Sequence, residues 1–181
     1  MCNNPPTPAA TARPAATSTH LTFERLRGCG AATCCGSKFP KDAQAIYCWT
    51  TKTIVFLLDK DVLTGTSDLF LFESVSHEYG HHVQWLSGIM EASYLRTYRT
   101  PQQGDSWRRF ELQANCLSGA FIGSVWRSLK RPQSDFADLR LLREDLSTHG
   151  KASNYAYWLN RGFQAKGPGA CNTFAAKSRV S

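Results

Sequence analysis

The stretch Ser76–Gln84, SHEYGHHVQ, holds three histidines and a glutamate within six positions. Residues four apart in an α-helix lie on the same face, so His77 and His81 point the same way. His82 is one position further round the helix and points elsewhere. The spacing His77-Glu78-x-x-His81 therefore predicts two imidazole ligands for one metal ion. Glu78 would lie beside that metal, placed to take a proton from a metal-activated water.

A third ligand has to come from outside this stretch. Two neutral imidazoles favour zinc or a neighbouring transition metal, and a catalytic zinc usually has three protein ligands. The usual downstream extension of the motif is absent, because Gln84 and Ser87 occupy its positions. The candidates are Glu73, Glu91, Asp105, Glu111 and His149. We prefer Glu111, because it lies in the apolar, small-residue segment FELQANCLSGAF, where a buried carboxylate needs a positively charged partner.

The metal motif lies in a long, strongly apolar segment, Ser67–Gly88, which begins with a good N-cap and ends at a glycine. This pattern predicts a buried helix. Upstream, two β-rich runs within 44–59 flank residues 50–52 and predict a hairpin. Further helices are expected over 105–130, 135–146 and 154–164. The chain is therefore predicted to be one α+β domain, a small sheet or hairpin followed by four or five helices.

The first twenty residues differ from the rest in composition. They are rich in Pro, Ala and Thr, cannot bury enough apolar surface to fold, and predict a tether ahead of a folded domain over 21–181. The sequence contains no run of eighteen apolar residues, so no membrane-spanning helix is predicted. A start at Met1-Cys2 followed by such a tether is similar to a bacterial lipoprotein, which would carry lipid on Cys2. The alternative is an ordinary cytoplasmic start that happens to contain a cysteine.

The cysteine content also favours a location outside the cytoplasm. The chain has seven cysteines, and cytosolic proteins of this size rarely keep so many thiols. Apart from Cys2, six remain for three disulfides of open connectivity. They are Cys29, Cys34, Cys35, Cys48, Cys116 and Cys171. The cluster at 29–35, CGAATCC, has no second pair of zinc ligands, so it predicts a disulfide-stapled loop and not a zinc knuckle.

The net charge of +7 comes from basic residues scattered along the chain. They do not alternate with aromatic residues as in nucleic-acid binders, so no nucleic-acid partner is expected. The charge fits weak attraction to an anionic cell envelope or to acidic substrates, or a solvated surface without a partner.

Four segments of the chain resemble the bacterial family of neutral zinc metallopeptidases. They are AIYCW…TIVFLLD, SHEYGHHVQWLSG, FELQANCLSGAF and HGKASNYAYWLNRGFQAKGPGACNTF, in family order over about 44–174. The resemblance implies a zincin-like fold with His77, His81 and Glu111 as zinc ligands and Glu78 as general base. It also implies a membrane-tethered domain outside the cytoplasm that hydrolyses peptide or protein substrates.

One position departs from this family pattern. Asn115 stands where the family usually has aspartate, one turn after Glu111 on the same helix face. The residue there is expected to accept the outer N–H of a ligand histidine and so raise its basicity. Asparagine can accept that bond but adds no charge, which predicts weaker zinc binding. Gln84 is a second candidate for a residue that supports the metal ligands without binding the metal itself.

Several further roles follow as expectations. Strand 53–58 could hold an extended peptide by edge pairing. His149 is the candidate second donor to the oxyanion, with Tyr155 and Tyr157 as rivals. A place in the core is expected for Tyr79, His82, Trp85, Trp107, Trp126 and Trp158. The alternative to a peptidase is a non-catalytic zinc-binding envelope lipoprotein, which Asn115 favours and Glu78 disfavours.

Overall fold

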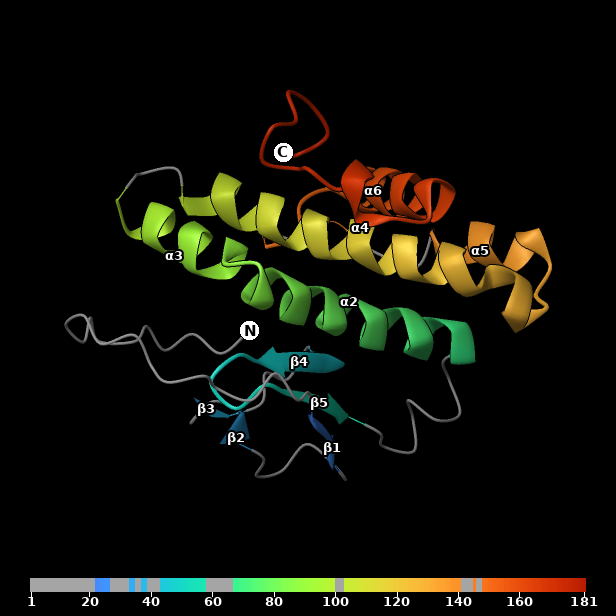
Figure 1. Ribbon diagram of the computed structural model, residues 1–181, viewed down its shortest axis with the longest axis horizontal. Coiled ribbons are helices and arrows are strands. Elements are labelled where there is room, and N and C mark those ends of the chain that lie inside the picture. Colours follow the sequence, from blue (N-terminus) through green and yellow to red (C-terminus); the bar gives the residue numbers. More distant parts are fainter. Residues whose placement is uncertain are drawn as a thin grey trace. The chain divides into compact units, whose positions relative to one another are not determined.

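The computed structural model describes residues 22–26, 33–34, 37–38, 43–57, 67–99, 103–140, 145 and 148–181. The chain separates into two compact units, Met1–Thr66 and Ser67–Ser181. All the described strands lie in the first unit and all the described helices in the second (Figure 1). The predicted α+β class, with strands before helices, is confirmed. The predicted tether at 1–20 lies outside the described residues.

The first unit contains a three-stranded sheet with the order β1-β5-β4. The strands are β1 Thr22–Leu26, β4 Ala45–Cys48 and β5 Thr53–Leu57. β4 and β5 pair antiparallel from Ala45↔Phe56 to Cys48↔Thr53, so the predicted hairpin is confirmed. β1 pairs parallel with β5. Two short strands, β2 Thr33–Cys34 and β3 Ser37–Lys38, form a separate antiparallel ladder.

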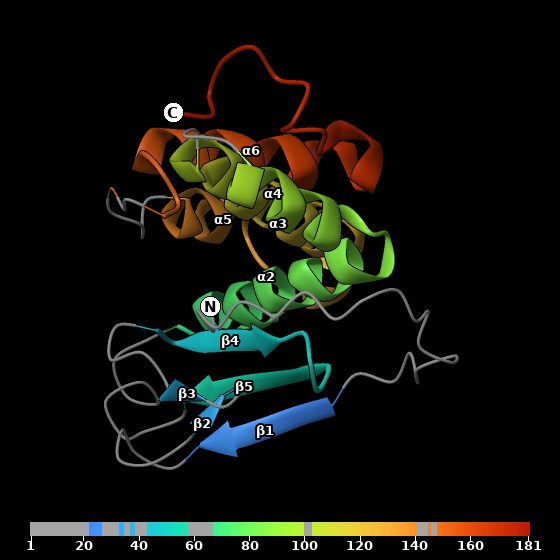
Figure 2. The ribbon, with the colours of Figure 1, turned by 90° about the vertical axis from the view of Figure 1, so that its left-hand side faces the viewer.

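β5 is the central strand of this sheet, and Figure 2 shows it between β4 and β1. The prediction that strand 53–58 binds a peptide by edge pairing is therefore wrong over Thr53–Leu57, because both of its edges already carry a strand. Leu58 lies outside the described residues. The hairpin pattern could not show the second neighbour, since β1 is about thirty residues upstream and pairs in parallel.

The second unit is built from helices in layers. Its elements are α2 Asp68–Leu86, α3 Ile89–Arg99, α4 Gln103–Leu129, α5 Gln133–Leu139, α6 Ala152–Ala165 and the short 3₁₀ helix η1 Pro168–Ala170. Ser67 caps α2 as predicted, because its hydroxyl accepts the Phe70 N–H at 3.1 Å. α4 runs back along α2, and α6 covers the other side of α4 (Figures 1 and 2).

Glycines allow α4 and α6 to come into backbone contact. A Cβ at Gly162 would lie 1.9 Å from the Cys116 carbonyl oxygen, and one at Gly119 would lie 2.0 Å from that of Leu159. No other residue fits at either position without separating the helices. The core beside this contact contains Leu69, Ile122, Phe136, Leu139, Tyr155, Leu159 and Phe163.

Two helix boundaries differ from the prediction. The helix expected over 135–146 ends at Leu139, and residues 141–144 lie outside the described residues. Gly88 does end α2, but α3 begins directly after it and was not predicted. Gly88 has φ +74, so the glycine turns the chain into a new helix and does not start a loop.

A disulfide joins Cys116 of α4 to Cys171, in the segment that follows η1. Cys48 is disulfide-bonded as well. Disulfide bonding is thus confirmed for three of the six predicted cysteines, while Cys29 and Cys35 lie outside the described residues. None of the described helices is long and apolar enough to cross a membrane.

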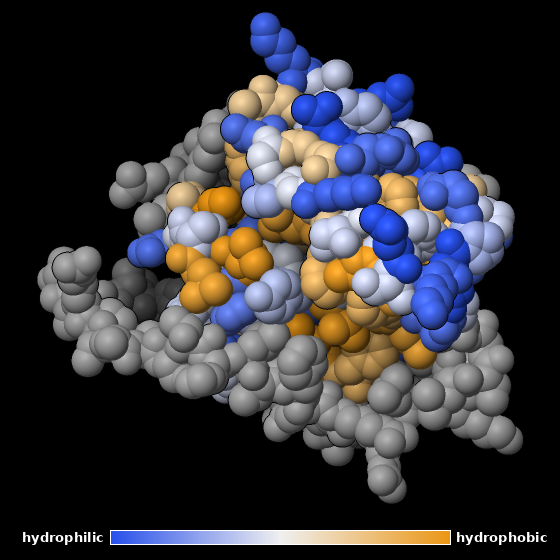
Figure 3. Space-filling model, turned by 45° about the vertical axis from the view of Figure 1, so that its right-hand side comes forward, coloured by the Kyte–Doolittle hydropathy of each residue, from blue (hydrophilic) through white to orange (hydrophobic). Residues whose placement is uncertain are grey.

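The predicted aromatic core is only partly right. Trp158 is buried, Trp126 packs against the core cluster, and His82 is buried against Trp85 with ring centroids 5.9 Å apart. Trp85 and Trp107 are half-buried. Tyr79 is 44% exposed, so its predicted place in the core is wrong. On the face drawn in Figure 3, hydrophobic residues lie in patches among hydrophilic ones.

Candidate metal centre

α2 and α4 bring three buried metal-binding side chains together. His77 and His81 occupy one face of α2, and Glu111 faces them from α4. The two imidazole Nε2 atoms lie 3.1 Å apart. Each of them lies 3.3 Å from Glu111 Oε2. The three donor atoms therefore form a nearly equilateral triangle.

This triangle has the size that a zinc ion requires. Tetrahedral ligands at zinc bond lengths lie about 3.3 Å from one another. Glu111 Oε2 is buried, and no imidazole near it is aligned for a hydrogen bond, so it has no hydrogen-bond partner among the described residues. A buried carboxylate oxygen needs a compensating partner, which a divalent cation supplies. The nitrogen and oxygen donors together fit zinc.

The surrounding charges keep Glu111 in its anionic form. Burial raises the pKa of its carboxyl, but the imidazoles of His149, His81 and His77 outweigh burial and hold the pKa well below its usual range. Burial lowers the pKa of His81, but the charges of Glu111 and Glu78 and the contact with Gln84 outweigh it, so the net shift is upward. Glu78, which is only partly buried, thus acts electrostatically on this centre.

The outer nitrogen of His77 faces Asn115. Its Nδ1 lies 2.6 Å from Asn115 Oδ1, and Asn115 is fully buried. An amide oxygen can only accept, so this contact puts the proton on Nδ1 and leaves Nε2 free to bind a metal. Asn115 Nδ2 is buried and has no hydrogen-bond partner among the described residues.

The outer nitrogen of His81 faces Gln84. Its Nδ1 lies 2.8 Å from Gln84 Oε1. Gln84 Nε2 donates to the Phe110 carbonyl oxygen at 2.8 Å and to Gln113 Oε1 at 2.9 Å. The sequence analysis did not identify Gln113, because its contact joins residues 29 positions apart. A glutamine in the segment that also supplies Glu111 was the one signal that could have suggested it.

His149 lies at the edge of the centre, just before α6. Its Nε2 is 3.2 Å from Glu111 Oε2, and its ring centroid is 5.8 Å from that of His77. Donor atoms of His77, Glu111 and His149 all lie within 4.8 Å of one another, so His149 could also reach a metal. It is 32% exposed, and its Nδ1 contacts the exposed Thr148. This exposure places His149 where a substrate could reach it.

The structure does not bring the other candidates to this group. Glu91 is exposed on α3, and Asp105 pairs with Arg109 Nε at 2.7 Å. Glu73, although buried, is not among the gathered ligand atoms of the described residues. Tyr155, a rival of His149, is buried in the helical core.

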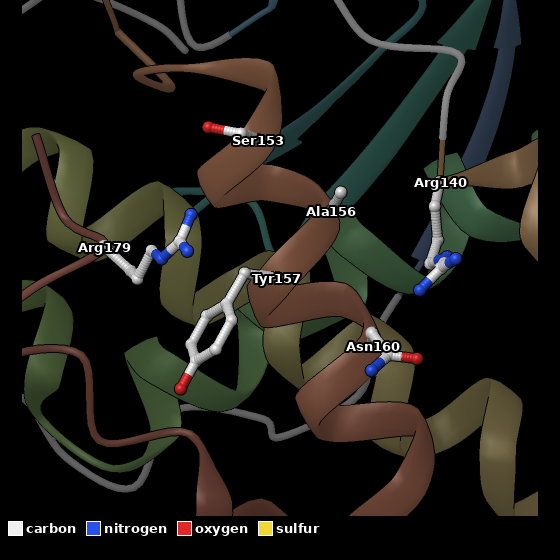
Figure 4. A pocket seen from close by; sticks show the side chains of 6 residues that line it. All are labelled: Arg140, Ser153, Ala156, Tyr157, Asn160 and Arg179. Atoms are coloured by element: carbon white, nitrogen blue, oxygen red, sulfur yellow. The ribbon is translucent and has the colours of Figure 1, made fainter.

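Tyr157, the other rival, lines a separate hollow on the outer face of α6. Figure 4 shows this hollow with Arg179 beside Tyr157 and Arg140 across the helix. The Arg179 guanidinium lies 5.6 Å from the Tyr157 ring centre. The hollow is lined by Arg140, Ser153, Ala156, Tyr157, Asn160 and Arg179, none of which belongs to the metal centre.

A buried His-His-Glu centre on two packed helices defines a candidate zinc protein. Residues 22–138 match the family described as "Putative neutral zinc metallopeptidase". That segment is 117 of 181 residues, so the chain belongs to this family. His149 and Cys171 lie beyond the matched segment.

Curated relatives are longer than this chain. The uncharacterized protein YpfJ of Escherichia coli K12 is 32% identical over 136 residues, which cover 64% of this chain and 47% of the relative. The uncharacterized protein Rv2575 of Mycobacterium tuberculosis H37Rv is 30% identical over 129 residues, covering 56% and 43%. The chain thus spans less than half the length of these relatives. No solved structure matches, so the zincin-like fold stays a prediction.

Proposed function

We propose that this protein is a zinc-dependent peptidase. The observation that carries the proposal is the triangle of buried donors, 3.1 to 3.3 Å apart, in which the Glu111 oxygen has no hydrogen-bond partner among the described residues. His77, His81 and Glu111 would hold the zinc. When bound, zinc activates a water molecule and polarises the carbonyl of a peptide bond.

The side chains around the ligands have distinct tasks in this proposal. Glu78 takes a proton from the attacking water and passes it to the leaving amine. His149 donates a hydrogen bond to the negative charge that develops on the carbonyl oxygen, because it stands at the exposed edge of the centre. Asn115 and Gln84 hold the two imidazoles in orientation.

The proposed substrate is a peptide or protein met outside the cytoplasm. The disulfide-bonded cysteines support this location, since such bonds persist in oxidising compartments. A lipid on Cys2 would tether the domain to a membrane. No nucleic acid is part of the proposal.

A non-catalytic zinc-binding protein is the second candidate. Asn115 favours it, because a neutral amide stands where the family resemblance implies a charge and one of its buried donors has no partner among the described residues. Glu78 opposes it, because a purely structural site has no use for that carboxylate.

Zinc content and peptide cleavage test the proposal together. Elemental analysis after mild dialysis should find about one zinc per native chain and much less in Glu111→Ala. Cleavage of a fluorogenic peptide library should vanish in Glu78→Gln while zinc remains. Glu91→Gln, at an exposed glutamate of α3, is the matched control and should keep both. Zinc without cleavage in the native protein supports the second candidate, and absence of zinc rejects both.

A further inference from the structure

A chain of buried hydrogen bonds leads from the metal centre to the C-terminal segment. Its first member, His81, contacts Gln84 through Nδ1 at 2.8 Å. Gln84 Nε2 donates to Gln113 Oε1 at 2.9 Å, and Gln113 Nε2 donates to the Cys171 carbonyl oxygen at 3.0 Å. The side chains of His81, Gln84 and Gln113 are all buried, so water does not compete for these bonds.

The Cys171 carbonyl determines the direction of every bond in this chain. A carbonyl oxygen can only accept, so Gln113 must turn its Nε2 toward Cys171 and its Oε1 toward Gln84. Gln84 must then present Nε2, whose second hydrogen goes to the Phe110 carbonyl. Only Gln84 Oε1 is left for His81. Nδ1 of His81 therefore carries the proton, and Nε2 is free for the metal.

The partner of His77 has no such support. Asn115 Oδ1 faces His77 Nδ1, but Asn115 Nδ2 has no hydrogen-bond partner among the described residues. Among the described residues, the orientation of the Asn115 amide therefore depends on its single contact with His77. Of the two metal-binding histidines, His81 is thus the one whose proton position is set by a connected network.

Two separate attachments hold the Cys171 carbonyl in place. The first is the disulfide between Cys171 and Cys116 of α4. The second is a reciprocal pair of hydrogen bonds: Thr173 Oγ1 donates to the Arg109 carbonyl at 2.6 Å, and Arg109 Nη1 donates to the Thr173 carbonyl at 2.7 Å. The segment is therefore fixed to the same helix that supplies Glu111.

We propose that Gln113 is a positioning residue for the metal centre, through which the disulfide-bonded C-terminal segment sets the proton position of His81. The inference rests on the proposed zinc site. It assigns a role in metal binding to a segment that lies more than fifty residues beyond Glu111 and supplies none of the proposed ligands. Loss of either Gln113 or the disulfide should weaken zinc binding.

Zinc affinity of the full chain, measured by competition with a chelator, tests this role. Gln113→Met keeps the size of the side chain but removes both polar ends, and should weaken zinc about tenfold. Gln113→Glu in its neutral form, which burial favours, keeps both an acceptor for Gln84 and an O–H donor for the Cys171 carbonyl, and should bind zinc nearly as well as the wild type. The double variant Cys116→Ala/Cys171→Ala should weaken zinc in the same direction as Gln113→Met.

Phe136→Leu is the matched control, because it removes buried packing from the hydrophobic core but no bond in the chain from Cys171 to His81 and none of the attachments of Cys171. It should lower stability and leave zinc affinity unchanged. Equal weakening in Gln113→Met, Gln113→Glu and Phe136→Leu would mean general destabilisation and overturn the proposal. Unchanged zinc affinity in Gln113→Met would overturn the role of Gln113 but leave the proposed zinc site standing. A wild-type protein that binds no zinc would overturn both proposals.

A measurement on the wild type avoids any risk that a variant fails to fold. Nitrogen-15 spectra of the zinc-loaded protein with labelled histidine should show His81 protonated at Nδ1 and metal-bound through Nε2. Zinc bound through Nδ1 of His81 would overturn the proposal.

Discussion

At the scale of single residues, charge decides how firmly the centre can hold zinc. Glu111 would supply one negative charge to a bound zinc, and both histidines would bind it as neutral imidazoles. Their outer partners, Asn115 and Gln84, are both neutral amides. The centre with zinc would therefore keep a positive charge in a buried place, which limits its affinity.

We expect Asn115→Asp to raise zinc affinity about tenfold, because a carboxylate beside His77 Nδ1 makes the imidazole a stronger ligand. It also removes a buried amide nitrogen that has no partner among the described residues. Chelator competition measures the change, with Asn115→Leu as the variant that should bind more weakly. Equal affinities in all three proteins would show that this contact does not tune the metal.

His149→Ala should keep zinc and lower kcat about a hundredfold, because it removes one donor to the developing oxyanion. Steady-state kinetics and zinc analysis on the same samples check this. Lys151→Ala, two residues on and exposed, is the control. If zinc falls as far as it does in Glu111→Ala, His149 is a ligand and its assignment as a donor is wrong.

The sequence brings His77 and His81 together because helix geometry alone fixes residues four apart. Glu111 could be selected by chemistry, since a carboxylate in an apolar helix needs a partner. Gln113 could not be found in either way. Its task depends on the Cys171 carbonyl, 58 positions away, and on a hydrogen-bond direction that only the assembled structure defines.

At the scale of elements, the contact between α4 and α6 depends on glycine. Gly162→Ala places a Cβ only 1.9 Å from the Cys116 carbonyl oxygen, so the helices must separate. We expect a loss of about 3 kcal/mol or more in the free energy of unfolding. Gly169→Ala is the matched control, since nothing lies within 4 Å of its Cβ position. Urea denaturation of both variants checks the prediction, which equal stabilities would contradict.

Asp68, in the first turn of α2, makes stability depend on pH. Its hydrogen bond with Arg131 lowers the pKa of the Asp68 carboxyl in the folded state. A carboxyl with a depressed folded pKa stabilises the protein above its unfolded pKa, and this contribution is lost as the pH falls through the folded pKa. Asp68→Asn should therefore unfold more easily than the wild type at neutral pH.

The difference between Asp68→Asn and the wild type should shrink as the solution is acidified. Thermal unfolding over a pH series measures it. The same substitution at Asp138, exposed in α5, should have no effect at any pH in the series. A gap between Asp68→Asn and the wild type that stays constant with pH would mean that the ion pair is not its cause.

Element positions could be predicted where the signal is local. The cap at Ser67 and the hairpin of β4 and β5 follow from neighbouring residues. The pairing of β1 with β5 is parallel and joins distant segments, so the sequence pattern left β5 looking like an edge. α3 was missed because a glycine with positive φ both ends α2 and turns the chain into the next helix.

At the scale of the whole molecule, the helical unit closes on itself through its C-terminal segment. The family match ends at residue 138, yet His149 and Cys171 beyond it both reach the centre, one directly and one through Gln113. The predicted number of disulfides followed from composition, but their pairing needed the fold. The C-terminal segment therefore contributes to the arrangement of the side chains at the proposed zinc site.

The disulfide between Cys116 and Cys171 should account for a large part of the stability of this unit. It spans 55 positions, and closing a loop of that length restricts the unfolded chain by about 4 kcal/mol. Cys116→Ala/Cys171→Ala should lose stability of this order in urea denaturation of the metal-free protein. Wild type treated with alkylator but no reductant should label at most three of its seven cysteines, because Cys48 is bonded as well. Unchanged stability in the double variant would show that hydrogen bonds alone hold the C-terminal segment. Labelling of more than three cysteines would show that these disulfides are not formed.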